Sequence, residues 1–428
     1  MTRINAYCKA LLSKNVANDC GPKDTFSMNT VLFFIIFFFI SALLAAYMTL
    51  RLFSQTAFRP IWKIAIALAI VFILFLPVFG IILRRSGFYN SAVHLLVWIG
   101  DLGIGFLSFV FTYVVIRDLM GLPVGAFNKI KSIISRSGRK KVASSTSVEN
   151  PSRRAFLINS MNYGILAAAA LSTGYGIEEA RRTPAIKEMP IVMPHLPYEF
   201  DGFRIVQITD LHVGPTFGRS CVEEIVAVVN SLEADIVALT GDLVDGTVDQ
   251  LADDVAPLKQ IRSAMGNYFV TGNHEYYSGV IEWIAEIKRL GFSVMLNEHR
   301  IITRDGASLL LAGVTDYNGG NFLASHRSDP QKALQAAPET IIKILLAHQP
   351  KSIFGAARAG CNFQISGHTH GGQFFPWNFV IGLLQPYVSG LHTYQNTQIY
   401  VSRGTGYWGP PVRLGSPSEI TLIKLVSG

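Results

Sequence analysis

Cysteine is scarce in this chain. Four are present among 428 residues, namely Cys8, Cys20, Cys221 and Cys361, and no two of them form a CxxC pair. This spacing excludes a structural zinc site built from cysteine pairs and a framework of disulfide bonds. We therefore expect Cys221 and Cys361 to be buried thiols, with a single bridge in an oxidising compartment as the alternative.

Charged residues are also few, at 15% of the chain, whereas half of the residues are hydrophobic. The charges are unevenly distributed, because residues 1–182 contain 20 Lys and Arg against 7 Asp and Glu, and residues 183–428 contain 17 against 22. The C-terminal part thus lacks the basic surface that binding to a phosphate backbone requires. No nucleic-acid partner is expected for it.

Long uncharged runs dominate the first 120 residues, for which we predict a membrane region with three transmembrane helices. Residues 31–50 are long enough to cross a bilayer core, and residues 64–83 form a second run in which Pro77 is expected to cause a kink. The third run, residues 93–116, contains Asp101 among glycines. A buried acid can mark a functional site within a membrane, but the glycines favour close helix packing in which the acid finds a partner.

Basic residues follow the third run, so residues 121–182 are predicted to form a basic cytoplasmic linker and a fourth apolar segment. The linker contains Lys129, Lys131, Arg136, Arg139, Lys140 and Lys141. SRRAFLINS at 152–160, followed by an alanine-rich stretch, resembles a twin-arginine export signal, and the alternative is a retained fourth helix flanked by Arg153 and Arg154. Either interpretation places residues 183–428 on the extracytoplasmic side of a bacterial inner membrane, in a multi-pass protein.

From about residue 201 short apolar runs alternate with helical patterns, which indicates an α/β domain within residues 183–428. Five of these runs end in Asp, Asn or His, often beside a glycine: FRIVQITDLH, DIVALTGDLVD, NYFVTGNHE, IIKILLAHQP and FQISGHTH. We expect five buried strands here. Polar groups at the carboxyl ends of such strands converge on one crevice, where α/β folds place their chemistry.

Seven side chains at these strand ends are candidate metal ligands. They are Asp210, His212, Asp242, Asn273, His348, His368 and His370. A set of nitrogen and oxygen donors without a thiolate suits two divalent ions such as Mn, Fe or Zn, bridged by one carboxylate. Two such ions roughly 4 Å apart would activate a shared water.

The ordered set DLH, GDLVD, GNHE, a single His and GHTH resembles the calcineurin-like metallophosphoesterase superfamily over roughly residues 201–425. The closing segment SRGTGYWGPPVRLGSPSEITLIKL is similar to the membrane-attached bacterial branch of that family. The resemblance implies a four-layer α/β/β/α sandwich. It also implies that one metal is held by Asp210, His212, Asp242 and His370, and the other by Asp242, Asn273, His348 and His368. Asp242 would bridge them, His274 would be the catalytic histidine, and Asp245 would orient it.

The expected function is therefore a membrane-anchored, dinuclear metal-dependent phosphoesterase that hydrolyses a phosphodiester or pyrophosphate bond by metal-activated hydroxide. FFPWNFVIGLLQPYV at 374–388 is either core or an apolar lip against the bilayer that admits a lipid-linked or nucleotide-diphospho substrate. The alternative function is a non-catalytic metal-binding sensor or scaffold on a membrane protein. The sequence does not predict the oligomeric state.

Other polar residues carry weaker predictions. His195, His299 and His326 are expected at the surface, in polar contexts. His392 follows the last motif and is weighed as a substrate contact, with a surface role as the stronger alternative. Arg403 and Arg413 are either phosphate-binding residues or ordinary salt-bridge partners.

Overall fold

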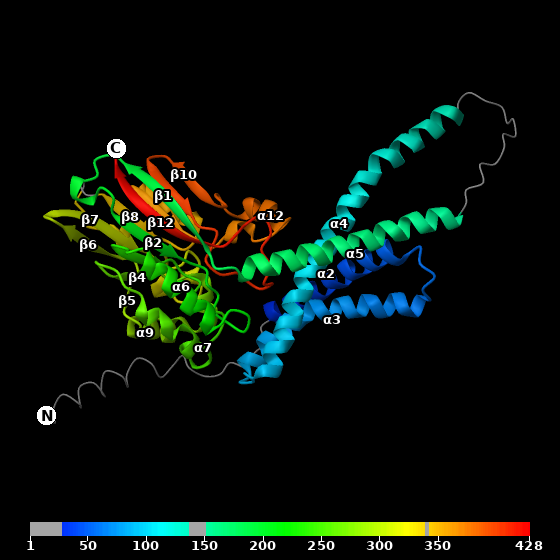
Figure 1. Ribbon diagram of the computed structural model, residues 1–428, viewed down its shortest axis with the longest axis horizontal. Helices are drawn as coiled ribbons and strands as arrows, with labels where there is room; N and C mark the ends of the chain where they lie inside the picture. The colour runs from blue at the N-terminus through cyan, green and yellow to red at the C-terminus, as the bar shows by residue number, and fades with distance from the viewer. Residues whose placement is uncertain (1–27, 137–150, 339–341) are drawn as a thin grey trace.

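The computed structural model describes residues 28–136, 151–338 and 342–428 (Figure 1). Cys8, Cys20 and the basic linker residues 139–141 lie outside these ranges. Four long helices come first: α2 (Met28–Phe53), α3 (Pro60–Arg85), α4 (Ser91–Arg136) and α5 (Pro151–Arg181). Each is long and apolar enough to cross a membrane. Many of their large apolar side chains, such as Leu43 and Phe72, are exposed, as expected for surfaces that contact lipid.

Glycines let helices α3 and α4 approach each other closely. A Cβ atom at Gly100 would overlap Leu76 and Pro77, and one at Gly103 would overlap Ile73. The close packing predicted from these glycines is therefore confirmed, and Asp101 between them is buried. Helix α3 continues through Pro77, and α4 runs beyond the third predicted span as far as Arg136.

Twelve strands in the described residues form two six-stranded sheets. The first has the order β1 (Ala185–Met193), β12 (Glu419–Ser427), β2 (Arg204–Ile208), β3 (Ile236–Leu239), β4 (Asn267–Phe269) and β5 (Phe292–Val294). The second has the order β10 (Gly390–Tyr394), β11 (Thr397–Val401), β9 (Phe363–Ser366), β8 (Lys343–Leu346), β7 (Ala307–Gly313) and β6 (Glu298–Arg304). Strands β2, β3 and β4 are parallel neighbours, and so are β8 and β9.

Alternating side chains in these strands build the layers. In β3, Ile236 and Ala238 lie in the cluster between the two sheets, while Val237 and Leu239 pack in the cluster beneath the helices. That helical layer consists of α6 (Arg219–Ser231), α7 (Val248–Val255) and α9 (Val280–Arg289). Helices α10 (Pro330–Ala333) and α11 (Ile353–Arg358) cover the second sheet. The predicted four-layer α/β/β/α sandwich is confirmed.

The sandwich is docked against the long helices. The ring of Phe374 lies 5.6 Å from that of Phe109 in α4, and the backbone amide of Arg413 donates to the carbonyl of Gly176 in α5 at 2.9 Å. Val412 is buried in the same apolar cluster as residues of α2 to α5. The segment that joins α5 to β1 contains three residues, 182–184. The domain is therefore held against the helices by chain connection and by packing.

Candidate metal centre

The seven predicted ligands follow the carboxyl ends of five strands, as the sequence indicates. Asp210 and His212 come after β2, Asp242 comes after β3, and Asn273 begins helix α8 (Asn273–Ser278) after β4. His348 comes after β8, and His368 and His370 come after β9. Strands β2 to β4 are parallel neighbours in one sheet, and β8 and β9 are parallel neighbours in the other. The five loops therefore lie together at the carboxyl ends of these strands.

Five of these residues have a left-handed backbone conformation that side chains other than glycine rarely adopt. The φ angles are 55° at Asp210, 50° at His212, 51° at Asp242, 74° at His368 and 51° at His370. Each costs on the order of 1 kcal/mol or more and persists only where the surrounding structure enforces it. Clustering of this strain at one place is typical of a functional site.

Glycines allow the ligand loops to approach one another. A Cβ atom at Gly272 would overlap the carboxylate of Asp242, and one at Gly367 would overlap the carboxylate of Asp210. Both glycines directly precede a predicted ligand, in GNHE and GHTH. Any larger residue there would displace a ligand carboxylate.

The predicted ligands form two groups of donor atoms. In the first, Nε2 of His212 lies 3.1 Å from Nε2 of His370, which lies 3.5 Å from Oδ1 of Asp210. In the second, Nε2 of His348 lies 3.1 Å from Oδ2 of Asp242 and 3.1 Å from Nδ1 of His368. Each group could hold a metal ion. Nitrogen atoms about 3 Å apart have the separation expected of two ligands bound at about 2.1 Å to one ion.

The hydrogen-bonding partners of these groups fit a cation. Nδ1 of His348 lies 2.8 Å from the carbonyl oxygen of Thr240, which can only accept, so Nδ1 carries the hydrogen. Nε2 of His348 then faces the Asp242 carboxylate and Nδ1 of His368. Burial by itself lowers the pKa of His348, but Asp242 and Asp210 outweigh it and hold this pKa well above its ordinary value, so this position attracts a proton or a metal cation. Oδ1 of Asn273 is buried without a hydrogen-bond partner in the described residues, as expected of an oxygen that ligates a metal.

Charge states at the centre also suit metal binding. Burial lowers the pKa of His368 to about 3, with a further contribution from His348. The pKa of His370 is held well below its ordinary value by burial and by the neighbouring His212 and Arg413. Burial alone would raise the pKa of Asp242, but His348 and His274 outweigh it and hold this pKa well below its usual range. Neutral His368 and His370 and an ionised Asp242 are the forms that ligate metals, whereas His348, whose pKa is raised, must release its proton when a metal binds.

His274 lies beside the predicted ligands and is oriented by Asp245. Its Nδ1 donates to Oδ1 of Asp245 at 2.5 Å, and its Nε2 lies 4.0 Å from Oδ2 of Asp242. Burial by itself lowers the pKa of His274, but the carboxylates of Asp242 and Asp245 outweigh it and raise this pKa to about 9. Bound cations would reduce the shift by offsetting the charge of Asp242. The imidazole is therefore held in one orientation and can carry a proton.

Glu275 is a buried residue of the site to which sequence reasoning assigned no role. Its carboxylate accepts from the backbone amides of Leu243 at 2.7 Å, Gly272 at 2.6 Å and Asp242 at 3.1 Å. It therefore ties the loop after β3 to the loop after β4, each of which carries a predicted ligand. The signal that could have revealed it is the position of Glu275 three residues after Gly272, the spacing of a helix capping box.

Arg413 fits neither role proposed from the sequence. The guanidinium is fully buried and donates to the carbonyl oxygens of Gly406 at 3.0 Å, Ser416 at 2.7 Å and Arg403 at 2.9 Å. Its Nη2 also lies 3.2 Å from Nδ1 of His370. Arg413 therefore organises the closing segment behind a predicted ligand. Arg403 is half-buried, and its side chain lies near Gly371 in the GHTH loop.

The prediction that His326 lies at the surface is wrong. It is buried in the short helix Ala324–His326, and its Nδ1 is hydrogen-bonded to the hydroxyl of Tyr276 at 2.9 Å. His392 donates to the carbonyl of Ser389 at 2.8 Å and stacks on Tyr387, so its polar contacts stay within its own loop. His195 is exposed.

Cys221 and Cys361 are free thiols, so they do not form the single bridge that the sequence left open. Cys361 is buried, as expected, and its thiol donates to the carbonyl oxygens of Lys343 and Phe363. Cys221 is only partly buried, on helix α6.

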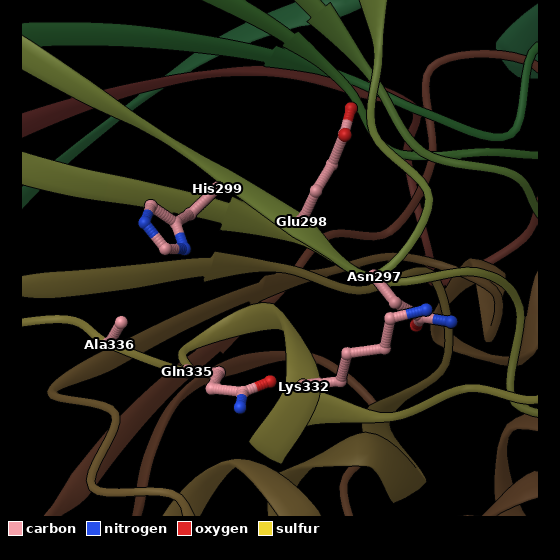
Figure 2. Close-up of a pocket in the computed structure, with 6 residues that line it drawn as sticks. All are labelled: Asn297, Glu298, His299, Lys332, Gln335 and Ala336. Carbon is pink, nitrogen blue, oxygen red and sulfur yellow. The ribbon is translucent and has the colours of Figure 1, made fainter.

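A separate hollow of about 400 Å³ lies at the edge strand β6 and helix α10 (Figure 2). It is lined by Asn297, Glu298, His299, Lys332, Gln335 and Ala336. His299 donates to the carbonyl of Ala333 at 2.7 Å, and Glu298 pairs with Arg300 at 3.0 Å. None of the lining residues is a predicted metal ligand, and the polar contacts of His299 and Glu298 are made with Ala333 and Arg300. The hollow is therefore unrelated to the metal centre.

Comparisons with known proteins agree with this geometry. Residues 203–372 match the calcineurin-like phosphoesterase family. A transmembrane protein with a metallophosphoesterase domain from Bos taurus is 42% identical over 262 residues, which cover 58% of this chain and 59% of the bovine protein. The Danio rerio protein of the same description is 35% identical over 70% of this chain and 68% of its own length. A metallophosphoesterase of Helicobacter pylori is 38% identical over 64% of this chain and 73% of its own length.

The match to the Danio rerio protein covers more of the chain than residues 183–428 contain, so the likeness extends into the helical region. Members of this family use divalent metals, and the two donor groups described above are where this chain could bind them. The chain belongs to the calcineurin-like metallophosphoesterase family.

Proposed function

We propose that this protein is a membrane-anchored phosphoesterase with two divalent metals that hydrolyses a phosphodiester or a pyrophosphate. The observation that carries the proposal is the position of Asp242. Its Oδ2 lies 3.1 Å from His348 in one donor group and 3.8 Å from His212 in the other, so a single carboxylate reaches both. A carboxylate that reaches both groups can bridge two metal ions about 3.5 to 4 Å apart.

The chemistry expected from two bound ions is activation of water and neutralisation of phosphoryl charge. Asp210, His212, Asp242 and His370 would hold one ion, and Asp242, Asn273, His348 and His368 the other. His274 supplies the proton that the leaving oxygen needs, because its Nδ1 is fixed on Asp245 and its Nε2 is left to face the centre. Arg403, whose side chain lies near Gly371, would contact a substrate phosphate.

The sensor or scaffold alternative would leave the predicted ligands without a catalytic partner. The orientation of His274 by a buried carboxylate favours the enzyme, because a site that only binds metal has no use for a positioned proton donor beside it. Manganese, iron and zinc all suit the mixed nitrogen and oxygen donors. We further propose that residues 183–428 lie on the extracytoplasmic side of a bacterial inner membrane, on the strength of the basic linker before helix α5.

The function is tested by assaying the full chain, purified in detergent and loaded with Mn²⁺, on bis(p-nitrophenyl) phosphate and on a soluble nucleotide pyrophosphate. Asp242→Asn is expected to lower hydrolysis on the order of 10²-fold or more. Asp305→Asn is the matched control, because Asp305 also has a positive φ but is exposed in the turn between β6 and β7. Metal-loaded wild type that hydrolyses neither compound would favour the sensor alternative.

A further inference from the structure

Helix α12 (Trp377–Leu384) is apolar and uncovered. Its sequence WNFVIGLL has no charged residue, and none of its residues is buried. Its exposed large side chains are Trp377, Phe379, Val380, Leu383 and Leu384. A soluble surface rarely exposes so many neighbouring apolar side chains, which indicates a contact with a partner or a membrane.

The start of α12 is fixed to both the metal centre and the membrane helices. The helix begins seven residues after His370, and Gly372 packs so closely on the backbone of Asn378 that a Cβ atom would overlap it. Just before α12, Phe374 packs against Phe109 of helix α4, and its carbonyl accepts from the amide of Trp377 at 2.9 Å. Figure 1 shows α12 on the side of the sandwich that faces the long helices.

A second exposed apolar side chain, that of Trp408, lies between helix α12 and the metal centre. Its ring lies 6.0 Å from that of His274. Gln373 connects it to the start of α12, since the Gln373 side chain accepts from the amide of Trp408 at 2.9 Å and donates to the carbonyl of Trp408 at 3.0 Å. The segment that follows carries Val412 into the apolar cluster of the long helices. The exposed side chains of α12 together with Trp408 are called the apolar rim below.

We propose that the apolar rim lies in the interface of the bilayer that helices α2 to α5 cross, and that it brings the phosphoester of a lipid to the metal centre. The substrate class rests on the proposed function, whereas the membrane contact stands without it. A helix of eight residues is about 12 Å long, too short to cross a bilayer but suited to lie along its surface. Tryptophans at the base of α12 and beside His274 are the side chains that membrane interfaces favour.

A bilayer fits the apolar rim better than a protein partner does. The rim is continuous with the apolar cluster of four helices that could cross a membrane, so a bilayer around those helices reaches it without any further component. Helix α12 has no charged residue that could orient a protein partner by complementary charge. A lipid surface binds an apolar helix face without such an orientation.

The membrane contact is tested by fluorescence quenching on the full chain in phosphatidylcholine nanodiscs. Leu383→Cys, in a background in which Cys8, Cys20 and Cys221 are replaced by Ser, is labelled with bimane. Tyr198→Cys is the matched control, because both side chains are almost fully exposed, at 85% and 86%, and the nine residues of β1 separate Tyr198 from the end of helix α5. Lipids brominated near the headgroup are expected to quench the label at position 383 and not at 198. Equal quenching at both positions, or none at 383, would overturn the membrane contact.

The substrate class is tested with phosphatidylglycerol, a phosphodiester, and cytidine diphosphate-diacylglycerol, a pyrophosphate, in phosphatidylcholine vesicles, against soluble bis(p-nitrophenyl) phosphate. Wild type is expected to hydrolyse at least one of the lipids. Leu383→Asp should lower that rate about tenfold by opposing insertion, without changing hydrolysis of the soluble ester, and Tyr198→Asp should change neither rate. Hydrolysis of the soluble ester alone would overturn the lipid substrate. Failure to hydrolyse these compounds and the soluble nucleotide pyrophosphate would instead refute the proposed function itself. A Leu383→Asp effect equal on both substrates would also count against the rim.

Discussion

The carboxylate of Asp245 lies 2.5 Å from Nδ1 of His274, and the same oxygen accepts from Nδ1 of His212 at 3.1 Å. One carboxylate therefore orients a predicted metal ligand and the proposed proton donor together. The backbone carbonyl of Asp245 in turn accepts from Arg84 at the end of membrane helix α3, at 2.9 Å. The helical region thus contacts the loop on which the proposed proton transfer depends.

His274→Ala should slow the hydrolysis of alkyl phosphoesters by a factor on the order of 10² to 10⁴, because an alkoxide needs a proton to leave. Nitrophenyl esters should be affected far less, since nitrophenolate leaves unaided. The comparison requires steady-state rates for both esters and a metal analysis that shows nearly intact content. If both ester classes slow equally, His274 acts as a phosphate-binding group instead.

Asp245→Asn should show a weaker form of the same bias toward loss of alkyl ester hydrolysis. The amide keeps the shape of the side chain but removes the negative charge that favours a protonated His274. Because His212 also loses its charged partner, metal affinity should fall about tenfold as well. The two effects are separated by measuring rates at saturating Mn²⁺. Wild-type ratios of alkyl to nitrophenyl rates in this variant would exclude the orienting role.

Metal content after reconstitution should approach two ions per chain, because the predicted ligands form two separate donor groups. Asp242 belongs to the second group, and its Oδ2 lies 3.8 Å from His212 of the first. Asp242→Asn should reduce occupancy of both sites, and His370→Ala mainly that of one. Elemental analysis of the purified variants distinguishes these cases. Undiminished content in both variants would show that the seven residues do not bind metal as proposed.

Glu275→Ala should destabilise the domain by about 2 to 4 kcal/mol, because three buried backbone amides lose their acceptor. Thermal unfolding of the metal-free chain in detergent measures the effect. Glu224→Ala, at an exposed position on α6, is the control and should be nearly neutral. Metal affinity should fall in the first variant only, since Glu275 joins two ligand loops. An unchanged unfolding temperature would contradict the role assigned to Glu275.

The side of the membrane is tested by reporters fused after Gly428. An alkaline phosphatase fusion should be active and a green fluorescent protein fusion dark if residues 183–428 lie outside the cytoplasm. Changing Arg153 and Arg154 to Lys should retain the domain inside if this pair acts as an export signal. Unchanged export would exclude the twin-arginine signal and support the interpretation of residues 152–176 as a retained fourth helix. The reverse reporter pattern would refute the proposed topology.

Much of the centre could be predicted because its chemistry lies at strand ends. The run of apolar residues in ILLAH or FQIS indicates a buried strand, and the polar residue that follows must lie at its carboxyl edge. The roles of Glu275 and Arg413 could not be read this way. Both depend on backbone groups brought together from distant loops, and a sequence pattern records side chains, not the carbonyls and amides that surround them.

The burial of His326 also could not be predicted from the sequence, because it depends on a contact with a distant residue. Its neighbours in the sequence, Ser325 and Arg327, suggest a solvated loop, and its burial follows from a hydrogen bond to Tyr276, fifty residues away. The sequence leaves residues 374–388 open between core and apolar lip, because composition alone does not distinguish a buried apolar segment from an uncovered one. Only the fold shows that no layer of the sandwich covers it.

The three residues between helix α5 and strand β1 set how far the centre can move from the bilayer. Fully extended, they span about 10 Å, and packing of Phe374 and Val412 on the helices shortens that reach further. An enzyme held this close to the bilayer meets its substrate by lateral diffusion along the membrane surface, and not by diffusion through the surrounding solution. Its turnover would then follow the number of phosphoester molecules per unit area of membrane, so that diluting the surface with inert lipid would slow it even when the bulk concentration is unchanged.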